Sequence, residues 1–397
     1  MQRKKVLWFA TRFPYPNIGG DVLLTYKHLQ GLSKWSAVYL FSLDEYNNFN
    51  LKNNKKLVKE TGIKDSFCFK IDKKKALFNS AKTYFSNIPA QCYYYWDKKA
   101  FNYFEKTINE INPDIIIFQT VRTYFYFKNI NHNNKYSFLV DAISNNYNAA
   151  LNYVDFKTKV IYKNELKKLL NVERDMIENS KKTFFVSNRD IKWEEKKGIN
   201  TKNCYSILNG VDLNYFEYKK PNLNSNYITF FGNMRTVANN DAALFLIKDI
   251  FPKVKKEIEN AKIKIVGINP SKELLSYHNN KDIIITGKVD DIKKELYDSR
   301  IIVSPLRIGA GLQNKVLEAA ALGIPQIVSD LVFEGISFFK KEEDILVSNT
   351  NEIVNTITNI FNNNKKLKKL SINSRKVIEI YYKWENSYKE LKMHLNV

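Results

Sequence analysis

Residues 304–325 read SPLRIGAGLQNKVLEAAALGIP and contain a complete junction between a strand and a helix. The apolar run at 301–304 predicts a buried strand, and the glycine pair Gly309-x-Gly311 that follows it predicts a turn. A helix is predicted over about 312–322, because the Gly-Ile-Pro sequence that comes next is of the kind that ends helices. A strand, a tight turn and a helix in this order are typical of a parallel α/β fold.

Short apolar runs rich in β-branched and aromatic residues recur along the rest of the chain, with helical stretches between them. They lie at 6–10, 38–42, 67–71, 115–118, 138–141 and 184–187 in the first half, and at 228–231, 263–266, 283–286, 301–304 and 326–329 in the second. Runs of this length between helices predict parallel strands buried on both faces. Two such series predict two Rossmann-like, doubly wound α/β domains in tandem.

The turn dipeptide Asn209-Gly210 and the polar stretch at 219–226 mark the boundary between the two series. We expect an N-terminal domain over 1–205, a second domain over 206–375 and a C-terminal helix over 376–397. That helix should pack on the body of the protein, because apolar residues recur along it every three or four positions. The stripe consists of Val377, Tyr381, Trp384, Tyr388, Leu391 and Leu395.

The composition is that of a folded protein. With 44% apolar and 26% charged residues, the chain is neither disordered nor a small disulfide-stapled scaffold. Its apolar runs are far shorter than the ~20 residues that cross a bilayer, and its N-terminus lacks the apolar stretch of a signal peptide. Three widely spaced cysteines indicate a reducing compartment. We therefore expect a cytoplasmic location.

The net charge of +22 comes almost entirely from lysine, since only nine of the 63 basic residues are arginine. A nucleic-acid partner is not expected, because the chain lacks the usual binding motifs and is poor in arginine. Two explanations remain open. The lysines are either a compositional bias of the solvated surface or a means of attracting anionic lipid headgroups.

One part of the first domain favours the lipid hypothesis and a peripheral location on the inner face of the cell membrane. Lysines at 52–59, 73–75 and 98–99 lie near the aromatic cluster 93–96 in the sequence. Aromatic rings beside lysines suit a bilayer interface. The alternative is a lysine-rich surface beside an aromatic helix that packs on the core.

Two further junctions between strands and helices carry glycine. Gly19-Gly20 follows the first predicted strand, and paired glycines at a helix N-terminus let backbone amides approach an anion. Gly232-Asn233-Met234-Arg235 follows the first strand of the second domain, where an arginine can present its fork to a phosphate.

In the junction at 304–325, Lys315 falls in the first helical turn, where a cation opposes the helix dipole unless an anion binds there. Glu318 lies on the same helix face, so the two side chains can hold a phosphate and a ribose side by side. A dinucleotide fingerprint is disfavoured, because Asn314 stands where its third glycine belongs. The chain has no Asp-x-Asp pair, no Walker loop and only four scattered histidines, which favours diphosphate binding without a metal or other cofactor.

The second half resembles the donor domain of the family 4 retaining glycosyltransferases, which have the GT-B fold of two Rossmann-like domains facing each other across a cleft. The resemblance covers about 205–340 and extends more weakly to Gly19-Gly20, Asp141, Ser144 and Val186-Ser187. Its motifs are Asn209-Gly210-Val211-Asp212, Phe231 to Arg235 with Asn239-Asn240-Asp241, Ile265-Val266-Gly267, Thr286 to Val289, Pro305-Leu306-Arg307, Lys315 with Glu318-Ala319, Gly323-Ile324-Pro325 and Glu334-Gly335.

The resemblance implies roles for these residues. Arg235 and Lys315 would neutralise the departing diphosphate, and Asp141 is the nearest candidate for a catalytic polar group in the first domain. Glu318 would bind the nucleotide ribose. The remaining donor contacts implied are Gly19, Gly20, Gly232, Asn233, Val289, Arg307, Gly309, Gly311 and Leu312.

One residue departs from the commonest family pattern. The second glutamate of the family's paired motif would stand eight residues before Glu318, where this chain has Ala310. The Arg-x-Gly-x-Gly variant of the family, matched here by Arg307, Gly309 and Gly311, has the same substitution.

These features predict a retaining, metal-independent transfer of sugar from a nucleotide-diphospho-sugar to a glycan or polyprenyl-linked acceptor, in surface polysaccharide biosynthesis. A nucleotide-sugar epimerase of the same fold is one alternative, although the scarcity of histidine argues against it. A non-catalytic protein that binds the donor is the other.

Overall fold

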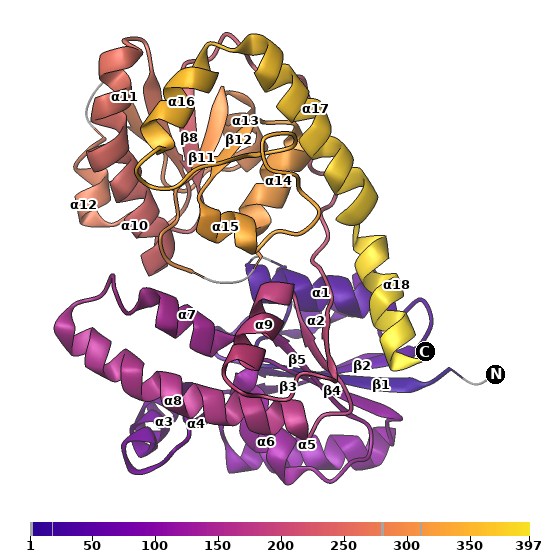
Figure 1. The fold of residues 1–397 in the computed structure, drawn as a ribbon. Helices are drawn as coiled ribbons and strands as arrows, with labels where there is room; N and C mark the ends of the chain where they lie inside the picture. The colour runs from indigo at the N-terminus through magenta and orange to yellow at the C-terminus, as the bar shows by residue number, and fades with distance from the viewer. Residues whose placement is uncertain (1–2, 18, 279–281, 310–311) are drawn as a thin grey trace. The chain divides into compact units, whose positions relative to one another are not determined.

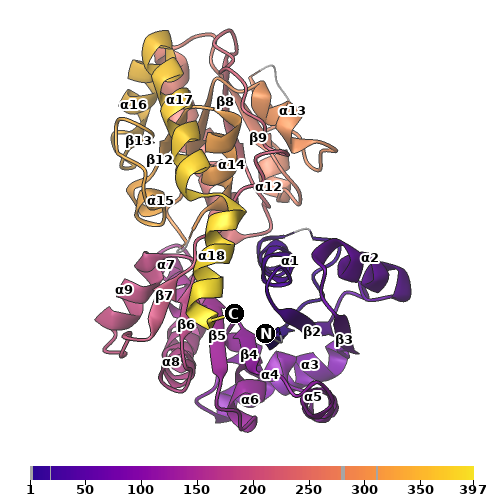
Figure 2. The ribbon, with the colours of Figure 1, turned by 90° about the vertical axis from the view of Figure 1, so that its right-hand side faces the viewer.

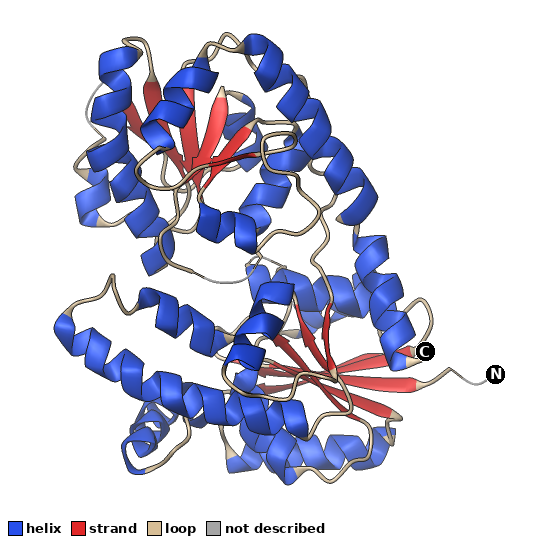
Figure 3. Ribbon diagram, in the orientation of Figure 1, coloured by secondary structure: helices blue, strands red, loops and turns tan. Residues whose placement is uncertain are grey.

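Two parallel β-sheets organise the chain, one in each of its two units (Figures 1 and 3). The computed structural model describes residues 3–17, 19–278, 282–309 and 312–397. The first unit comprises Met1–Asn209 and Trp384–Val397, and the second comprises Gly210–Lys383. Helices cover both faces of each sheet, which is the doubly wound α/β arrangement.

The sheet of the first unit has the strand order β3-β2-β1-β4-β5-β6-β7. Its central strands are apolar and buried on both faces, and Leu7, Trp8 and Phe9 are fully buried in β1. The strands are β1 (Lys5–Ala10), β2 (Ala37–Asp44), β3 (Asp65–Lys70), β4 (Ile115–Gln119), β5 (Lys135–Val140), β6 (Thr183–Phe185) and β7 (Cys204–Ser206).

The helices of the first unit lie between its strands in the sequence, except α18, which comes from the C-terminus. They are α1 (Gly20–Leu32), α2 (Leu51–Thr61), α3 (Lys73–Ser80), the 3-10 helix η1 (Ala81–Phe85), α4 (Ala90–Tyr95), α5 (Lys98–Ile111), the 3-10 helix η2 (Val121–Thr123), α6 (Tyr124–Asn129), α7 (Ile143–Ala150), α8 (Phe156–Glu178), α9 (Asn188–Lys196) and α18 (Trp384–Leu395).

The sheet of the second unit has the order β10-β9-β8-β11-β12-β13. Its strands are β8 (Tyr227–Phe231), β9 (Lys262–Val266), β10 (Ile283–Ile285), β11 (Ile301–Ser304), β12 (Gln326–Val328) and β13 (Leu346–Val347). Its helices are α10 (Val237–Phe245), the π-helical turn η3 (Leu246–Ile250), α11 (Phe251–Glu257), α12 (Lys272–Leu275), α13 (Ile292–Tyr297), α14 (Asn314–Leu322), α15 (Asp330–Glu334), α16 (Ile353–Phe361) and α17 (Asn364–Tyr381).

The fold class expected from the sequence is confirmed, since every predicted apolar run forms a parallel strand. Two edge strands were not predicted. β7 has three residues, none fully buried, and β13 has two, so neither gives a readable apolar run. The strand predicted over 138–141 ends at Val140, which has a φ of 71°, so Asp141 belongs to the following turn.

The apolar stripe near the C-terminus is divided between α17 and α18, so the prediction of one continuous helix is wrong. The helix is interrupted at Tyr382 and Lys383, where the carbonyl of Tyr382 accepts a hydrogen bond from the amide of Val211 at 2.7 Å. The Tyr382 ring is buried and its hydroxyl is bonded to the backbone of Ser337. These contacts replace the bonds that a continuous helix would make.

Helix α18 packs on α1 within the first unit (Figures 1 and 2). A Cβ at Gly31 of α1 would lie 2.3 Å from the Tyr388 ring, so this position requires glycine. His28 is fully buried between Trp8, to which it is stacked at 5.7 Å, and Trp384 at 5.9 Å. Burial lowers the pKa of His28 to about 3, so its ring stays neutral in the core.

Within the described residues, no helix is long and apolar enough to cross a membrane. The aromatic cluster at 93–96 packs against the core of the first unit, with Tyr95 buried and the other three rings partly buried. These rings are therefore not the exposed aromatic surface that the lipid hypothesis assigned to them.

Candidate functional site

The two loops with the predicted cations follow neighbouring strands of the second sheet. β8 and β11 lie side by side, and the strand order runs away from them in opposite directions. Open α/β sheets bind their ligands outside the carboxyl ends of the strands at such a switch point. Arg235 follows β8 and Lys315 lies in the first turn of α14, which follows β11.

Two glycines make room in this region. A Cβ at Gly267, whose φ is +147°, would lie 1.8 Å from the carbonyl oxygen of Gly232. A Cβ at Gly232 would lie 3.3 Å from the Lys315 Nζ and 2.8 Å from the Asn239 amide nitrogen. The absence of side chains at both positions brings the β8 loop against the amine of Lys315.

Lys315 and Glu318 are partly buried side chains on one face of α14. The Lys315 amine donates to the Asn239 Oδ1 and lies 4.6 Å from the centre of the Phe230 ring. Burial lowers the pKa of Lys315 to about 7 and raises that of Glu318 to about 7, while the attraction between the two groups opposes both shifts. A bound anion would favour the protonated form of Lys315.

Arg235 is exposed and its guanidinium has only a neutral partner among the described residues. Its backbone amide donates to the Asn233 Oδ1 at 3.1 Å, and its Nη2 donates to the Asn269 Oδ1 at 3.5 Å. Asn269 also donates to Asn233 at 3.1 Å, which fixes the loop. An arginine held by amides in this way keeps its full charge for an incoming phosphate.

Arg307 is engaged inside the protein. It forms a two-pronged ion pair with Asp241 at 2.7 and 3.1 Å, and its guanidinium lies 4.3 Å from the Phe245 ring centre. This pair ties the β11 loop to α10. A direct contact of Arg307 with the donor stays a prediction.

Several other residues of the second unit were predicted to contact the donor. Gly309 has a φ of +116°, which favours glycine, and Leu312 is partly buried. Val289 packs partly buried on the apolar cluster around Phe231. Gly311 lies outside the described residues, as does Ala310, so the Arg-x-Gly-x-Gly interpretation of the loop stays a prediction.

Three predicted site residues belong to the first unit. Gly19, with a φ of +112°, is the N-cap of α1, and Gly20 is the first residue of that helix. Asp141 follows β5, and burial together with the neighbouring Asp190 raises its pKa well above the usual range. The catalytic role of Asp141 stays a prediction.

Asp141 belongs to a group of buried carboxyls that the sequence analysis missed. Burial raises the pKa of Glu173 and Asp190 to about 7, and burial with those two neighbours raises that of Glu194 to about 10. Glu173 accepts a hydrogen bond from the Ser144 amide at 3.1 Å. No sequence signal marks the group, because its members come from the β5 loop, α8 and α9.

Asn269 was also missed as a site residue, and Asn239 was quoted in a motif without a role. Asparagines are common in this chain, and only the fold brings these two to the two cations. Arg122, after β4, was missed for another reason. The scarcity of arginine that drew attention to Arg235 applies equally to Arg122 and would have found it.

Comparison with known proteins relates the second unit to one family. Residues 225–363 match a family model described as glycosyl transferases group 1. A Klebsiella pneumoniae protein described as an uncharacterized 44.6 kDa protein in the cps region is 23% identical over 232 residues. That match covers 56% of this chain, and the chain spans only 58% of the length of that relative.

Two solved structures show the same architecture along the whole chain. Anabaena HepE, in complex with UDP and glucose, has a TM-score of 0.69 at 12% identity and 99% coverage of both chains. A mutant of S. aureus TarM, in complex with fondaparinux, α-GlcNAc-glycerol and UDP, has a TM-score of 0.69 at 13% identity, with 99% of this chain and 100% of that chain covered. At these identities the likeness establishes the fold.

Proposed function

Since residues 225–363 match the group 1 glycosyltransferase family model and the chain has the GT-B fold, we propose that the protein transfers a sugar from a nucleotide-diphospho-sugar to an acceptor hydroxyl, with retention at the anomeric carbon. The observation that carries the proposal is the approach of Lys315 to Gly232 at the switch point, with Arg235 on the same loop. Two cations and a glycine-lined space suit a diphosphate.

The proposed chemistry follows from where charge develops. As the bond between the sugar and the diphosphate breaks, negative charge grows on the leaving group, and cations already in place stabilise it more in the transition state than before. Burial sets the pKa of Lys315 at about 7. Negative charge that grows beside the amine raises this pKa, so Lys315 is protonated more fully as the leaving group departs. Arg235 and Lys315 thus supply the charge that a divalent metal supplies in other transferases.

The neighbours suggest the donor and the setting. HepE and TarM were both solved with UDP, so we propose a UDP-sugar as donor. The relative from a cps region supports a place in surface polysaccharide biosynthesis, with a glycan or polyprenyl-linked acceptor at the cytoplasmic face of the membrane.

Acceptor-dependent release of nucleoside diphosphate tests the proposal. Purified protein with a nucleotide-sugar should release diphosphate only when an acceptor is added, and a chelator should leave the rate unchanged. An epimerase would interconvert the donor without an acceptor, and a binding partner would bind it without turnover. A strict Mg²⁺ requirement would contradict the metal-independent mechanism.

Glu318→Gln should weaken binding of free UDP, because a ribose contact is made before the chemical step. The loss expected is that of a hydrogen bond to a charged group, roughly 10-fold or more in Kd by calorimetry. Glu379→Gln, on the exposed side of α17, is the matched control. Unchanged UDP affinity would mean that Glu318 only pairs with Lys315.

The first unit also exposes an apolar surface that favours a lipid partner. Phe78 at the end of α3 is 77% exposed and Phe85 at the end of η1 is 94% exposed, and Leu77 and Tyr84 are exposed as well. The neighbouring lysines at 73–75 and 82 are exposed too. Exposed rings among lysines suit an anionic bilayer surface.

Vesicle sedimentation should therefore show binding to anionic vesicles that falls as salt rises. Replacing both Phe78 and Phe85 by serine should abolish most of this binding, whereas Ile372→Ser in α17 should not change it. Equal binding to neutral vesicles, or unchanged binding by the double variant, would contradict the lipid interpretation.

A further inference from the structure

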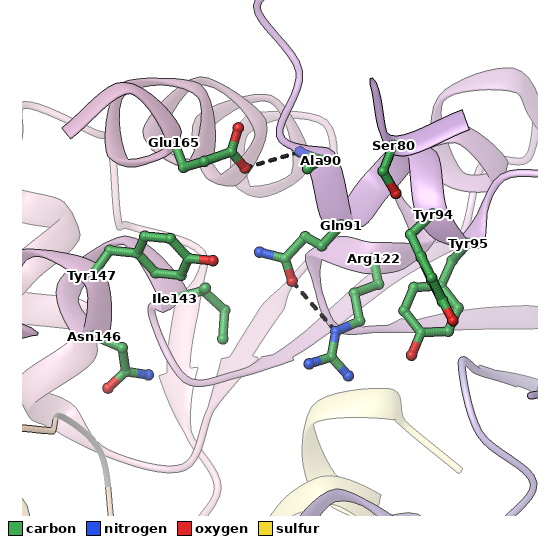
Figure 4. A pocket seen from close by; sticks show the side chains of 10 residues that line it. All are labelled: Ser80, Ala90, Gln91, Tyr94, Tyr95, Arg122, Ile143, Asn146, Tyr147 and Glu165. Atoms are coloured by element: carbon green, nitrogen blue, oxygen red, sulfur yellow. Dashed lines mark hydrogen bonds between the residues drawn. The ribbon is translucent and has the colours of Figure 1, made fainter. Parts of the chain in front are cut away.

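The first unit contains a pocket of about 520 Å³ that the donor site does not use (Figure 4). Its walls come from α3, α4, η2, α7 and α8, so it opens beside the carboxyl ends of β4 and β5. β4 is the neighbour of β1, and the strand order of this sheet reverses between them. The pocket therefore lies next to the position where α/β sheets bind ligands.

Arg122 projects into the middle of this pocket (Figure 4). Its Nε donates to the Gln91 Oε1 at 3.3 Å, and its guanidinium lies 5.6 Å from the centre of the Tyr95 ring. Among the described residues, its two terminal nitrogens have no hydrogen-bond partner. The nearest carboxylate oxygen, on Asp21, is 3.8 Å away.

Asp21 neutralises Arg122 only in part, because it serves a second arginine. Arg12 approaches the same carboxylate at 3.2 Å, and the amide of Val22 donates to it at 3.0 Å. Arg12 also has a buried Nε without a partner in the described structure. Two of the nine arginines of the chain thus share one aspartate beside the pocket.

The acidic residue of the pocket does not compete for Arg122. Glu165 accepts hydrogen bonds from the Ala90 amide at 2.9 Å and the Thr83 hydroxyl at 3.0 Å, and it pairs with Lys168 at 3.7 Å. These hydrogen bonds hold η1 and α4 against α8. Among the described residues that line the pocket, Arg122 is therefore the charged group that is left for a ligand.

The remaining walls suit a sugar ring. Tyr94 and Tyr147 are partly buried and present ring surface, and Gln91 and Asn146 present amides that hydrogen-bond hydroxyls (Figure 4). Aromatic surface with a few placed polar groups is the usual lining of a small-molecule site.

We propose that this pocket binds an acidic saccharide as the acceptor, with the carboxylate or phosphate of the sugar on Arg122. The inference rests on the proposed glycosyl transfer, because it assigns the acceptor to the first unit and the donor to the second. A planar guanidinium with two unused nitrogens matches the oxygens of either anion.

Ligand-observed NMR titration of the full chain tests this with three probes: methyl glucuronide, glucose 6-phosphate and methyl glucoside. The two anionic probes should bind better than the neutral one. Arg122→Gln keeps a polar side chain but removes the positive charge. It should weaken binding of the anionic probes by roughly 10- to 100-fold without changing the affinity for methyl glucoside. Arg3→Gln, on the surface of the same unit, should change nothing.

The identity of the anion follows from which anionic probe binds more tightly. Equal affinity for all three probes, binding of none, or an unchanged Arg122→Gln variant would overturn the inference. UDP binding is measured on the same samples, and it reports on the second unit alone. If UDP binds while the anionic probes do not, the acidic-acceptor inference fails and the proposed donor chemistry stands.

Discussion

Replacing Lys315 by alanine should lower turnover by about 100-fold or more, which is the expected loss when a preorganised group at the developing charge is removed. The effect should appear in kcat, because the charge on the leaving group grows only as the bond to the sugar breaks. Arg235→Ala should act in the same direction. Initial rates of nucleoside diphosphate release at saturating donor and acceptor measure both effects.

The structure provides controls for this experiment. Lys368→Ala removes an exposed lysine from α17 in the same unit and should leave kcat unchanged. Circular dichroism should show all variants folded, since Arg235 is exposed and Lys315 is only partly buried. Near-normal turnover in both alanine variants would contradict the assignment of these cations to the diphosphate.

A second large effect concerns stability and pH. Glu173, Asp190 and Glu194 have pKa values of about 7, 7 and 10 in the folded chain, all raised chiefly by burial. The folded state then holds protons that the unfolded state has lost above about pH 4.5. Their stabilising contribution is complete below that pH and is lost as pH rises through 7 toward 10.

Denaturant unfolding should therefore show stability falling from pH 6 to pH 9. Each carboxyl that is protonated in the folded state and ionised in the unfolded state adds a slope of about 1.4 kcal/mol per pH unit. Arg174 and Arg189 face the group and narrow the pH range over which stability is lost, since each lowers the pKa of a carboxyl near it.

Glu194→Gln removes one titrating carboxyl and should flatten the dependence. Glu195→Gln, at the next and exposed position of α9, is the matched control and should retain the wild-type slope. A wild-type stability that is constant or rises between pH 6 and pH 9 would contradict the buried, protonated group.

The sequence predicted the parts of this protein that are local in the chain. A buried parallel strand is a run of apolar residues and a glycine ends a helix, so β11 and α14 were predictable to within two residues. Lys315 and Glu318 were recognisable because an unfavourable cation and a carboxyl occur together in one helical turn. The short edge strands β7 and β13 carried no such pattern.

Contacts between distant segments were not predictable. The partner of Lys315 is Asn239, 76 positions earlier, and the partner of Arg307 is Asp241, 66 positions earlier. The pocket around Arg122 combines five separate segments, and the buried carboxyls combine three. Neither periodicity nor spacing records which loops a sheet brings together, because that depends on strand order.

The return of α18 to the first unit affects how the protein is synthesised. The face of α1 that carries His28 and Gly31 is covered by Trp384 and Tyr388, which are translated only after all of Gly210–Lys383. At about 5–20 residues per second, the ribosome needs roughly 10 to 35 s to make that segment. During this time the nascent first unit exposes an apolar helix face to chaperones, so its folding is completed only when the second unit has left the ribosome.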